Sequence, residues 1–210
     1  MQLTLLLNTG NEHKKREVAE ICSPHTVHMR TDFGLDGEFE EVGETFLENA
    51  LGKAQQLAAE LEADQFDRLG IHAVIADDSG ISVRALDGGP GVYSARFGAG
   101  ADGTHLSASE RNALLLEKLE GVTDRSAFYT CCMAAVLADG RILTVEDRLY
   151  GEIAHQPSSG SGGFGYDPVF YLPDRKCTVA DISDAEKHVI SHRGRACRDM
   201  IAALNPMLER

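Results

Sequence analysis

The clearest hydrophobic pattern of the chain is helical and covers residues 45–63. Apolar residues recur there at the three- and four-residue spacing of one helix face: Phe46, Ala50, Ala54, Leu57 and Leu61. Thr45 followed by Glu48 is typical of a capping box, in which each residue hydrogen-bonds the backbone of the other. The pattern therefore predicts a helix with one buried face.

The other apolar segments predict a mixture of strands and helices. Strands are expected at residues 3–7, 73–76, 128–137 and 142–149, and helices at residues 12–21, 109–119 and 192–204. Asp139-Gly140 between the last two strands is typical of a hairpin turn. Hairpin strands combined with single strands and helices predict an α/β fold with a mixed sheet, and we expect residues 1–210 to form one domain.

Composition and charge exclude several classes of protein. The chain has 210 residues and a net charge of -13, which opposes binding to a nucleic-acid backbone. Its apolar runs are too short to span a bilayer, and the start of the chain has no basic segment, so we interpret it as a first strand and not as a signal peptide. Five cysteines without a CxxC spacing favour reduced thiols in a cytoplasmic protein.

The stretch ADDSG places two carboxylates, Asp77 and Asp78, directly after a short apolar run. Successive side chains of a strand point to opposite faces, so the two acids are not expected to share one role. Mg²⁺ prefers oxygen ligands, usually one or two carboxylates together with substrate phosphate, so the pair could supply one metal ligand and one base or orienting group. The alternative interpretation is a polar turn, because Asp-Ser-Gly is also typical of turns.

Two further stretches carry charge at the start of expected helices. NTGNEHK joins a strand to a helix, where backbone N–H groups favour an anion and Lys14 adds positive charge; an ordinary turn with a solvated lysine is the alternative. EEVGETFLENALGKA contains Glu41 in the connecting loop and Lys53 on the helix. Glu48 has a capping role to explain it, so Glu41 is the better candidate for a metal ligand.

Two stretches late in the chain suggest ligand contacts. GGFGYDPVFY surrounds an aromatic residue with glycines, which favours a loop that lays Phe164 against a flat group; the alternative is a glycine-rich turn with a core phenylalanine. EKHVISHRGRA places His192 and Arg193 in the first turn of a helix, where cations oppose the helix dipole. That conflict indicates a role other than helix stability.

Together and in this order, TGNEHK, EEVGETFLENALGKA, ADDSGISVRALDGGPGVYSARF, GGFGYDPVF and EKHVISHRGRA resemble the inosine triphosphate pyrophosphatase family over nearly the whole chain. The resemblance implies a long mixed central sheet with helices and two lobes flanking an active-site cleft. It also implies a homodimer, dependence on Mg²⁺, and hydrolysis of ITP, dITP and XTP to the monophosphate and pyrophosphate.

The resemblance assigns roles to individual residues. It implies that Glu41 and Asp78 bind the metal and that Asp78 is also the candidate base. From the alternation of the strand, we expect Asp77 to orient the groups around it. The residues that the resemblance places around the triphosphate are Thr9, Gly10, Asn11, Glu12, His13, Lys14, Lys53 and Ser79. Those that it places around the nucleotide and its base are Phe164, Gly165, Tyr166, Asp167, Lys187, His192 and Arg193.

From these roles we expect water to attack the α-phosphorus, with Lys14 and Lys53 stabilising the phosphates. Arg193 and a protonated His192 offer only donors, which suit the 6-oxo group of hypoxanthine and xanthine. Two alternatives stay open at this point. One is a pyrophosphatase for other modified nucleotides, and the other is a protein that binds nucleotides without catalysis.

Overall fold

The described residues form one mixed sheet of seven strands in the order β2-β1-β3-β4-β5-β6-β7. The structure is a computed structural model and describes residues 1–35, 41–61, 64–100 and 102–209. The strands are β1 (Thr4–Asn8), β2 (Thr26–Met29), β3 (Ala73–Val83), β4 (Ser126–Leu137), β5 (Ile142–Ile153), β6 (Phe170–Leu172) and β7 (Cys177–Thr178).

Both strand directions occur in this sheet. β1 pairs in parallel with β2 and with β3, and the second pairing places Asn8 beside Ala76. β6 is antiparallel to both β5 and β7. The expected α/β fold with a mixed sheet is therefore confirmed.

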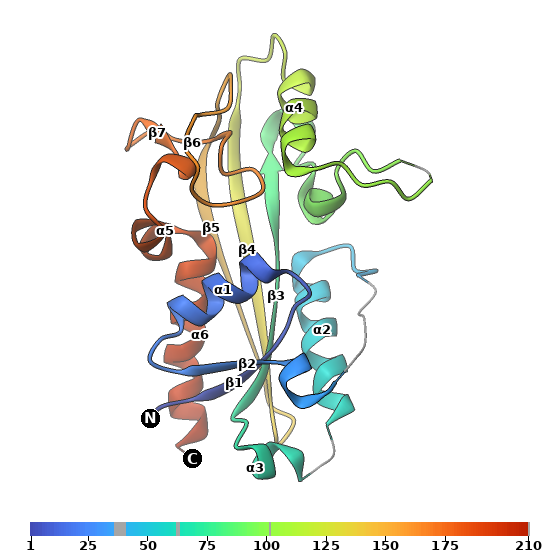
Figure 1. Cartoon of the computed structure of the whole chain (residues 1–210), viewed down its shortest axis with the longest axis vertical. Helices are drawn as coiled ribbons and strands as arrows, with labels where there is room; N and C mark the ends of the chain where they lie inside the picture. Colours follow the sequence, from blue (N-terminus) through green and yellow to red (C-terminus); the bar gives the residue numbers. More distant parts are fainter. Residues whose placement is uncertain (36–40, 62–63, 101, 210) are drawn as a thin grey trace. The chain divides into compact units, whose positions relative to one another are not determined.

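Most helices lie in the connections between these strands, and the last two follow β7 (Figure 1). They are α1 (Glu12–Ile21), α2 (Phe46–Glu60), α3 (Gln65–Leu69), α4 (Ala108–Lys118), α5 (Asp184–Ile190) and α6 (His192–Leu208). Short 3₁₀ turns lie at Arg30–Phe33, Arg84–Leu86, Gly91–Arg96 and Val179–Asp181. Among the described residues, no helix combines the length and apolar character that crossing a membrane requires.

The chain divides into two compact units. The first contains Met1–Asp78, Cys131–Asp147 and Arg193–Arg210, and the second contains Ser79–Thr130 and Arg148–His192. Strands β3, β4 and β5 contribute residues to both units. The expected cleft flanked by two lobes stays a prediction.

Helices cover both faces of the sheet in the first unit. Leu5 and Leu7 of β1 belong to a buried cluster with Val18 of α1 and Met200 of α6, whereas Leu6 packs with Leu57 of α2. This alternation follows from the two-residue period of a strand. Because both faces of β1 are covered, four of the five residues at 3–7 are leucine and only Thr4 is polar. Helix α2 thus lies on the face opposite to α1 and α6.

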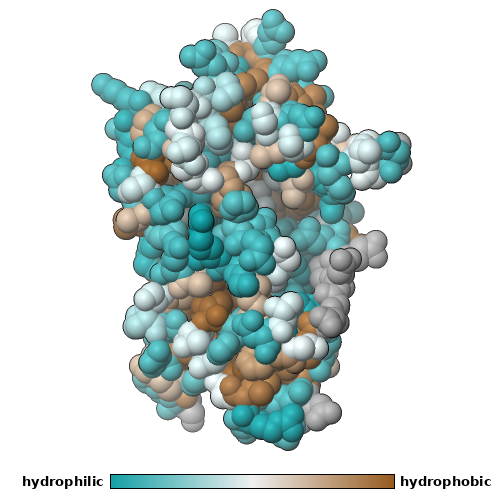
Figure 2. Space-filling model, in the orientation of Figure 1, coloured by the Kyte–Doolittle hydropathy of each residue, from teal (hydrophilic) through white to brown (hydrophobic). Residues whose placement is uncertain are grey.

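The second unit has its own core. Ile81 and Val83 of β3 pack in one buried cluster with Leu115 of α4 and with Phe170 of β6. Figure 2 shows hydrophilic residues over most of the visible face, with hydrophobic residues in separate patches. That surface agrees with the net charge of -13.

Most expected elements are present, but one boundary differs in a way that matters. The helix expected at residues 12–21 has those bounds, and the helix expected from residue 192 begins there as α6. The strand expected at residues 73–76 continues to Val83. Asp77 and Asp78 therefore lie inside a strand. The sequence analysis had placed them directly after the strand, with a polar turn as the alternative.

Candidate active site

Strand β3 presents Asp77 and Asp78 to opposite faces of the sheet. Asp77 contacts Lys14 of α1 and Arg193 of α6, and Asp78 contacts residues of α2 on the other side. The structure thus agrees with the expectation that alternation separates the two acids. Ser82 and the core residues Ile81 and Val83 continue the strand, which is why the Asp-Ser-Gly sequence does not turn here.

The carboxylate of Asp77 is held by two cations. Its Oδ2 lies 3.1 Å from Lys14 Nζ and 3.4 Å from both Nε and Nη2 of Arg193. Arg193 Nη1 donates to Glu17 Oε2 at 2.5 Å. Burial alone would raise the pKa of Asp77, but the charges of Lys14 and Arg193 hold that pKa well below its ordinary value. Asp77 is therefore a fixed anion.

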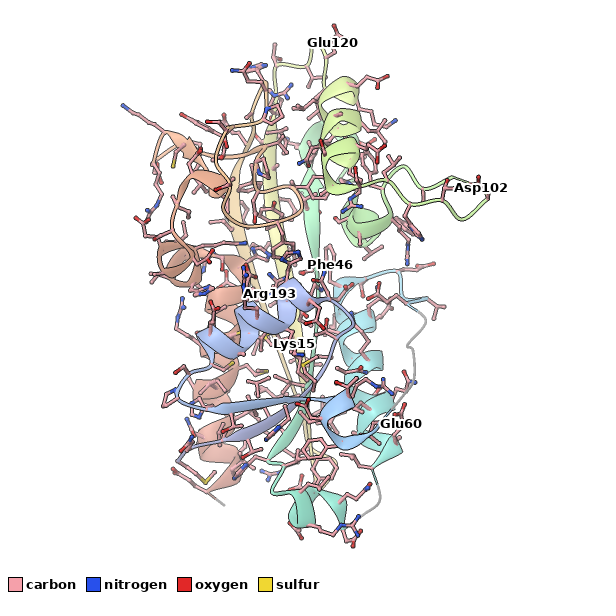
Figure 3. The ribbon with its side chains drawn as sticks, viewed as in Figure 1. Lys15, Phe46, Glu60, Asp102, Glu120 and Arg193 are labelled. Carbon is pink, nitrogen blue, oxygen red and sulfur yellow. The ribbon has the colours of Figure 1, made fainter. Side chains whose placement is uncertain are left out.

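Arg193 is the centre of this ion network and is almost fully buried, with 2% of its surface exposed. Figure 3 shows it at the start of α6, close to α1. The sequence analysis assigned Arg193 to the base of the nucleotide. All three guanidinium nitrogens donate to Glu17 or Asp77, and the role of Arg193 at the base stays a prediction.

Asp78 has different neighbours and a different pKa. Asn49 Nδ2 donates to Asp78 Oδ2 at 3.1 Å, and Lys53 Nζ lies 3.4 Å from Asp78 Oδ1. Burial raises the pKa of Asp78 above its ordinary value, although Lys53 and Lys14 oppose the rise. The two adjacent carboxyl groups are therefore pushed toward different proton affinities.

Lys53 links Asp78 to Glu41. Its ammonium donates to Glu41 Oε1 at 2.7 Å while also contacting Asp78. Burial would lower the pKa of Lys53, but Asp78, Asp77 and Glu41 together raise it. The lysine is thus a buried cation that gathers two carboxylates.

The start of α2 fixes the position of Asn49 and Lys53. Thr45 and Glu48 form the expected capping box, and one helical turn separates Asn49 from Lys53. Asn49 Oδ1 also accepts the Gly43 N–H at 2.9 Å. A Cβ at Gly43 would lie 2.6 Å from that oxygen, so the close approach of this loop to α2 requires glycine.

Glu41 and Asp78 suit a divalent cation. One ammonium reaches a carboxylate oxygen of each residue, so the two oxygens converge on a shared positive charge. Carboxylate oxygens are the donors that Mg²⁺ prefers, and one or two of them together with substrate phosphate are its usual protein ligands. Within the described ranges, which leave out Glu40, no cluster of three or more His, Cys, Asp or Glu residues forms a ready-made metal cage.

The loop before α1 is ordered by its own side chains. Asn11 is the N-cap, and its Oδ1 accepts the backbone N–H groups of His13 and Lys14 at 3.0 and 3.3 Å. Thr9 Oγ1 accepts the Asn11 N–H at 3.2 Å. Gly10 and Glu12 complete this segment. Its helix start therefore places Lys14 on the face of β3 that carries Asp77.

The second unit gathers another set of expected site residues. Lys187 Nζ lies 2.8 Å from Asp167 Oδ2 and 4.7 Å from the centre of the Phe164 ring. Asp167 Oδ2 also accepts the Phe164 N–H at 2.7 Å. Gly163 has φ +68°, and a Cβ there would meet Asp167 Oδ2, so glycine is needed beside this carboxylate.

The remaining expected residues have structural contacts in this unit. Tyr166 is buried, and its hydroxyl donates to the Ser94 carbonyl at 2.8 Å. Burial raises the pKa of Tyr166 to about 12. The Gly165 carbonyl accepts from Asn112 Nδ2 at 3.0 Å. Ser79 follows Asp78 in β3, and His192 is buried with its ring stacked on Tyr129.

Three residues of these networks escaped the sequence analysis. Glu17 lies one helical turn after Lys14, and Asn49 one turn before Lys53, so helical spacing from the expected lysines could have found both. Tyr129 reads as an ordinary strand residue, and nothing in the sequence distinguishes it from a core aromatic.

Comparison with known proteins places these residues in a wider context. The model of the Ham1 family matches residues 5–203. The dITP/XTP pyrophosphatase of Treponema denticola is 42% identical over 92% of this chain and 94% of its own. That of an Exiguobacterium species is 41% identical over 99% of this chain and 100% of its own. The structure of the Staphylococcus aureus Ham1 protein superposes with a TM-score of 0.81 at 34% identity, covering 97% and 99% of the two chains.

Proposed function

The chain belongs to the Ham1 family, and from this membership we infer that it is a nucleoside triphosphate pyrophosphatase that hydrolyses dITP, ITP and XTP. The products are the nucleoside monophosphate and pyrophosphate. Such a reaction removes deaminated purines from the nucleotide pool. The observation that carries the mechanism is the pair of carboxylates on β3, which face opposite sides of the sheet and contact different partners.

Asp78 is the proposed base of the reaction. A water oxygen attacks the α-phosphorus, the bond from that phosphorus to the bridging oxygen breaks, and pyrophosphate leaves. Asp78 accepts a proton from the water. The Asp78 carboxylate lies on the same face of β3 as Lys53 and Asn49, beside the proposed phosphate site.

Lys14 and Lys53 are proposed to stabilise the phosphates. Both carry positive charge beside the β3 carboxylates, one on each face of the strand. Phosphoryl transfer needs mainly positioning and charge stabilisation, which two fixed ammonium groups provide. Part of the phosphate site is proposed to be the α1 start at Thr9–Lys14, together with Ser79.

Glu41 and Asp78 are proposed to hold Mg²⁺. When bound, this ion would supply charge neutralisation at the phosphates and a template for the leaving group. Lys53 contacts both carboxylates and keeps them close together without the ion.

Arg193 and Asp77 are proposed as positioning residues. The guanidinium joins Glu17 to Asp77, and Asp77 in turn holds the Lys14 ammonium. These linked contacts fix the long, flexible side chain of Lys14 in one place. Fewer rotamers are then lost when Lys14 meets a phosphate.

The second unit supplies the proposed base-recognition residues. Lys187 has only donors, which suit the 6-oxo group of hypoxanthine and xanthine and oppose the 6-amino group of adenine. A site that depends on such hydrogen bonds rejects the wrong partner strongly. Phe164 lies under the Lys187 ammonium and offers a flat ring for stacking.

Two further features are proposed, the first of them on the family resemblance alone. One is a homodimer, and the other is a cytoplasmic location, which the five free cysteines support.

A substrate panel at fixed Mg²⁺ tests the function. The purified chain is incubated with ITP, dITP, XTP, ATP and GTP, and the phosphorus products are identified. We expect pyrophosphate from the first three substrates and little from ATP. Release of single phosphates, or a preference for ordinary or pyrimidine nucleotides, would overturn the assignment.

A further inference from the structure

Tyr129 of β4 contacts Asp167 and His192, two residues that the family resemblance places around the nucleotide and its base. Its hydroxyl donates to Asp167 Oδ1 at 3.2 Å. The other oxygen of that carboxylate, Oδ2, contacts Lys187 Nζ at 2.8 Å. Asp167 is thus held at one oxygen by Tyr129 and at the other by Lys187, so the hydroxyl limits how the carboxylate, and with it the ammonium, can turn.

The ring of Tyr129 makes a second connection. It stacks on the His192 imidazole with ring centres 4.7 Å apart and an interplanar angle of 15°. The Tyr129 ring also stacks on the Phe170 ring, with ring centres 4.4 Å apart and an interplanar angle of 28°. His192 and Tyr129 are both buried, at 5% and 6% exposure, so the phenol ring sets the plane of the imidazole.

We propose that Tyr129 is a positioning residue for base specificity. It orients Lys187 through Asp167 and orients His192 by stacking, so that the two donors keep a fixed geometry toward the 6-oxo group of the purine. This proposal rests on the proposed function, because it concerns how that site distinguishes ITP from ATP. A core aromatic would account for the burial and the ring stacking, but it would not need a hydroxyl bonded to a charged group.

Two variants separate the two connections. Tyr129→Phe removes the hydroxyl and keeps the ring, whereas Tyr129→Leu removes both. Tyr150→Phe is the matched control, because Tyr150 is a 67%-exposed tyrosine of β5 and its hydroxyl has no place in the site. Each variant is assayed for KM and kcat with ITP and ATP, for inhibition by pyrophosphate, and for its melting temperature.

Loss of the hydroxyl should raise KM for ITP by about three- to tenfold, the range of one net hydrogen bond. The kcat for ITP should stay within about twofold, and KM and kcat for ATP should be almost unaffected. The preference for ITP over ATP should therefore fall by the same factor as the rise in KM for ITP. Tyr129→Leu should lower that preference by a further factor of about three to ten. Inhibition by pyrophosphate, which has no base, should not change in Tyr129→Phe.

The outcomes separate this proposal from the function on which it depends. If the unmodified chain releases no pyrophosphate from ITP, the proposed function fails. If it does, and Tyr129→Phe matches Tyr150→Phe in its ITP-to-ATP ratio, the positioning role of Tyr129 is wrong. An equal loss for ITP, ATP and pyrophosphate, with a lower melting temperature, would make Tyr129 a core residue only and would also overturn the proposal.

Discussion

Replacing Arg193 with methionine should destabilise the protein severely. Arg193 is 2% exposed, and its guanidinium hydrogen-bonds two carboxylates that are themselves buried, Glu17 and Asp77. Methionine has a similar length but no donors and no charge. The variant therefore removes the Nη1 donor of Glu17 and two donors of Asp77, which keeps its contact with Lys14.

The magnitude follows from the charge balance of this network. Lys14 and Arg193 carry two positive charges, and Glu17 and Asp77 carry two negative ones, so the four residues are neutral together. Removing Arg193 takes away one of the two positive charges that contact these buried carboxylates. Breaking a buried ion pair in this way costs about 3–5 kcal/mol, a large part of the stability of a typical domain.

A double variant tests whether charge balance is the reason. Arg193→Met with Glu17→Gln is neutral again, so urea unfolding should show it to be more stable than Arg193→Met alone. The control is Arg195→Met, which breaks a partly exposed pair with Asp147 and should cost about 0–1 kcal/mol. A loss below about 1 kcal/mol in Arg193→Met, or a double variant that is less stable than the single one, would refute this reasoning.

Three shorter predictions concern other groups of the two units. Glu41→Gln should lose most ITP hydrolysis and regain part of it at high Mg²⁺, as a weakened metal ligand should; an activity that does not respond to Mg²⁺ would contradict that role. Lys14→Ala should lower kcat/KM for ITP about ten- to a hundredfold, the loss of one charge-assisted hydrogen bond, whereas Lys15→Ala, whose side chain is 39% exposed, should not. The pKa of Tyr166 is raised from its ordinary value near 10 to about 12, so the group stabilises the fold below pH 10 and this contribution is lost as the pH rises through 12. Alkaline unfolding should therefore be weaker in Tyr166→Phe than in the exposed-site control Tyr150→Phe.

The sequence predicted the elements whose patterns are local. Helix α1 has the predicted bounds, and the predicted capping box of α2 is present. Short elements were missed, among them β2 and α3, because four or five residues show no periodicity that can be distinguished from a loop. The predicted end of β3 was wrong because Asp-Ser-Gly favours a turn locally. The strand instead continues to Ile81 and Val83, which pack in the second core.

The candidate site was predictable as a set of residues but not as a set of contacts. Motifs identified Lys14, Lys53, Asp77 and Asp78, and the structure brings them into one unit. The partners of Arg193 depend on how α6 packs beside α1, and 176 residues separate Arg193 from Glu17 in the sequence. No pattern along the chain records such a contact, so the ion network around Arg193 was not predicted.

The two neighbouring acids of β3 should therefore fail in different ways when each is replaced by asparagine. Asp77→Asn removes the anion that compensates Lys14 and Arg193, so we expect a clear loss of stability in urea together with a loss of activity. Asp78→Asn removes a carboxylate whose ionised form is penalised by burial, and Lys53 keeps Glu41 as its partner. The stability of this variant should change little. Its ITP hydrolysis should fall to a small fraction of the original activity that added Mg²⁺ does not restore, because an amide does not accept the proton of the attacking water. Near-normal turnover in Asp78→Asn, or equal destabilisation by both variants, would show that alternation along the strand does not divide the two roles.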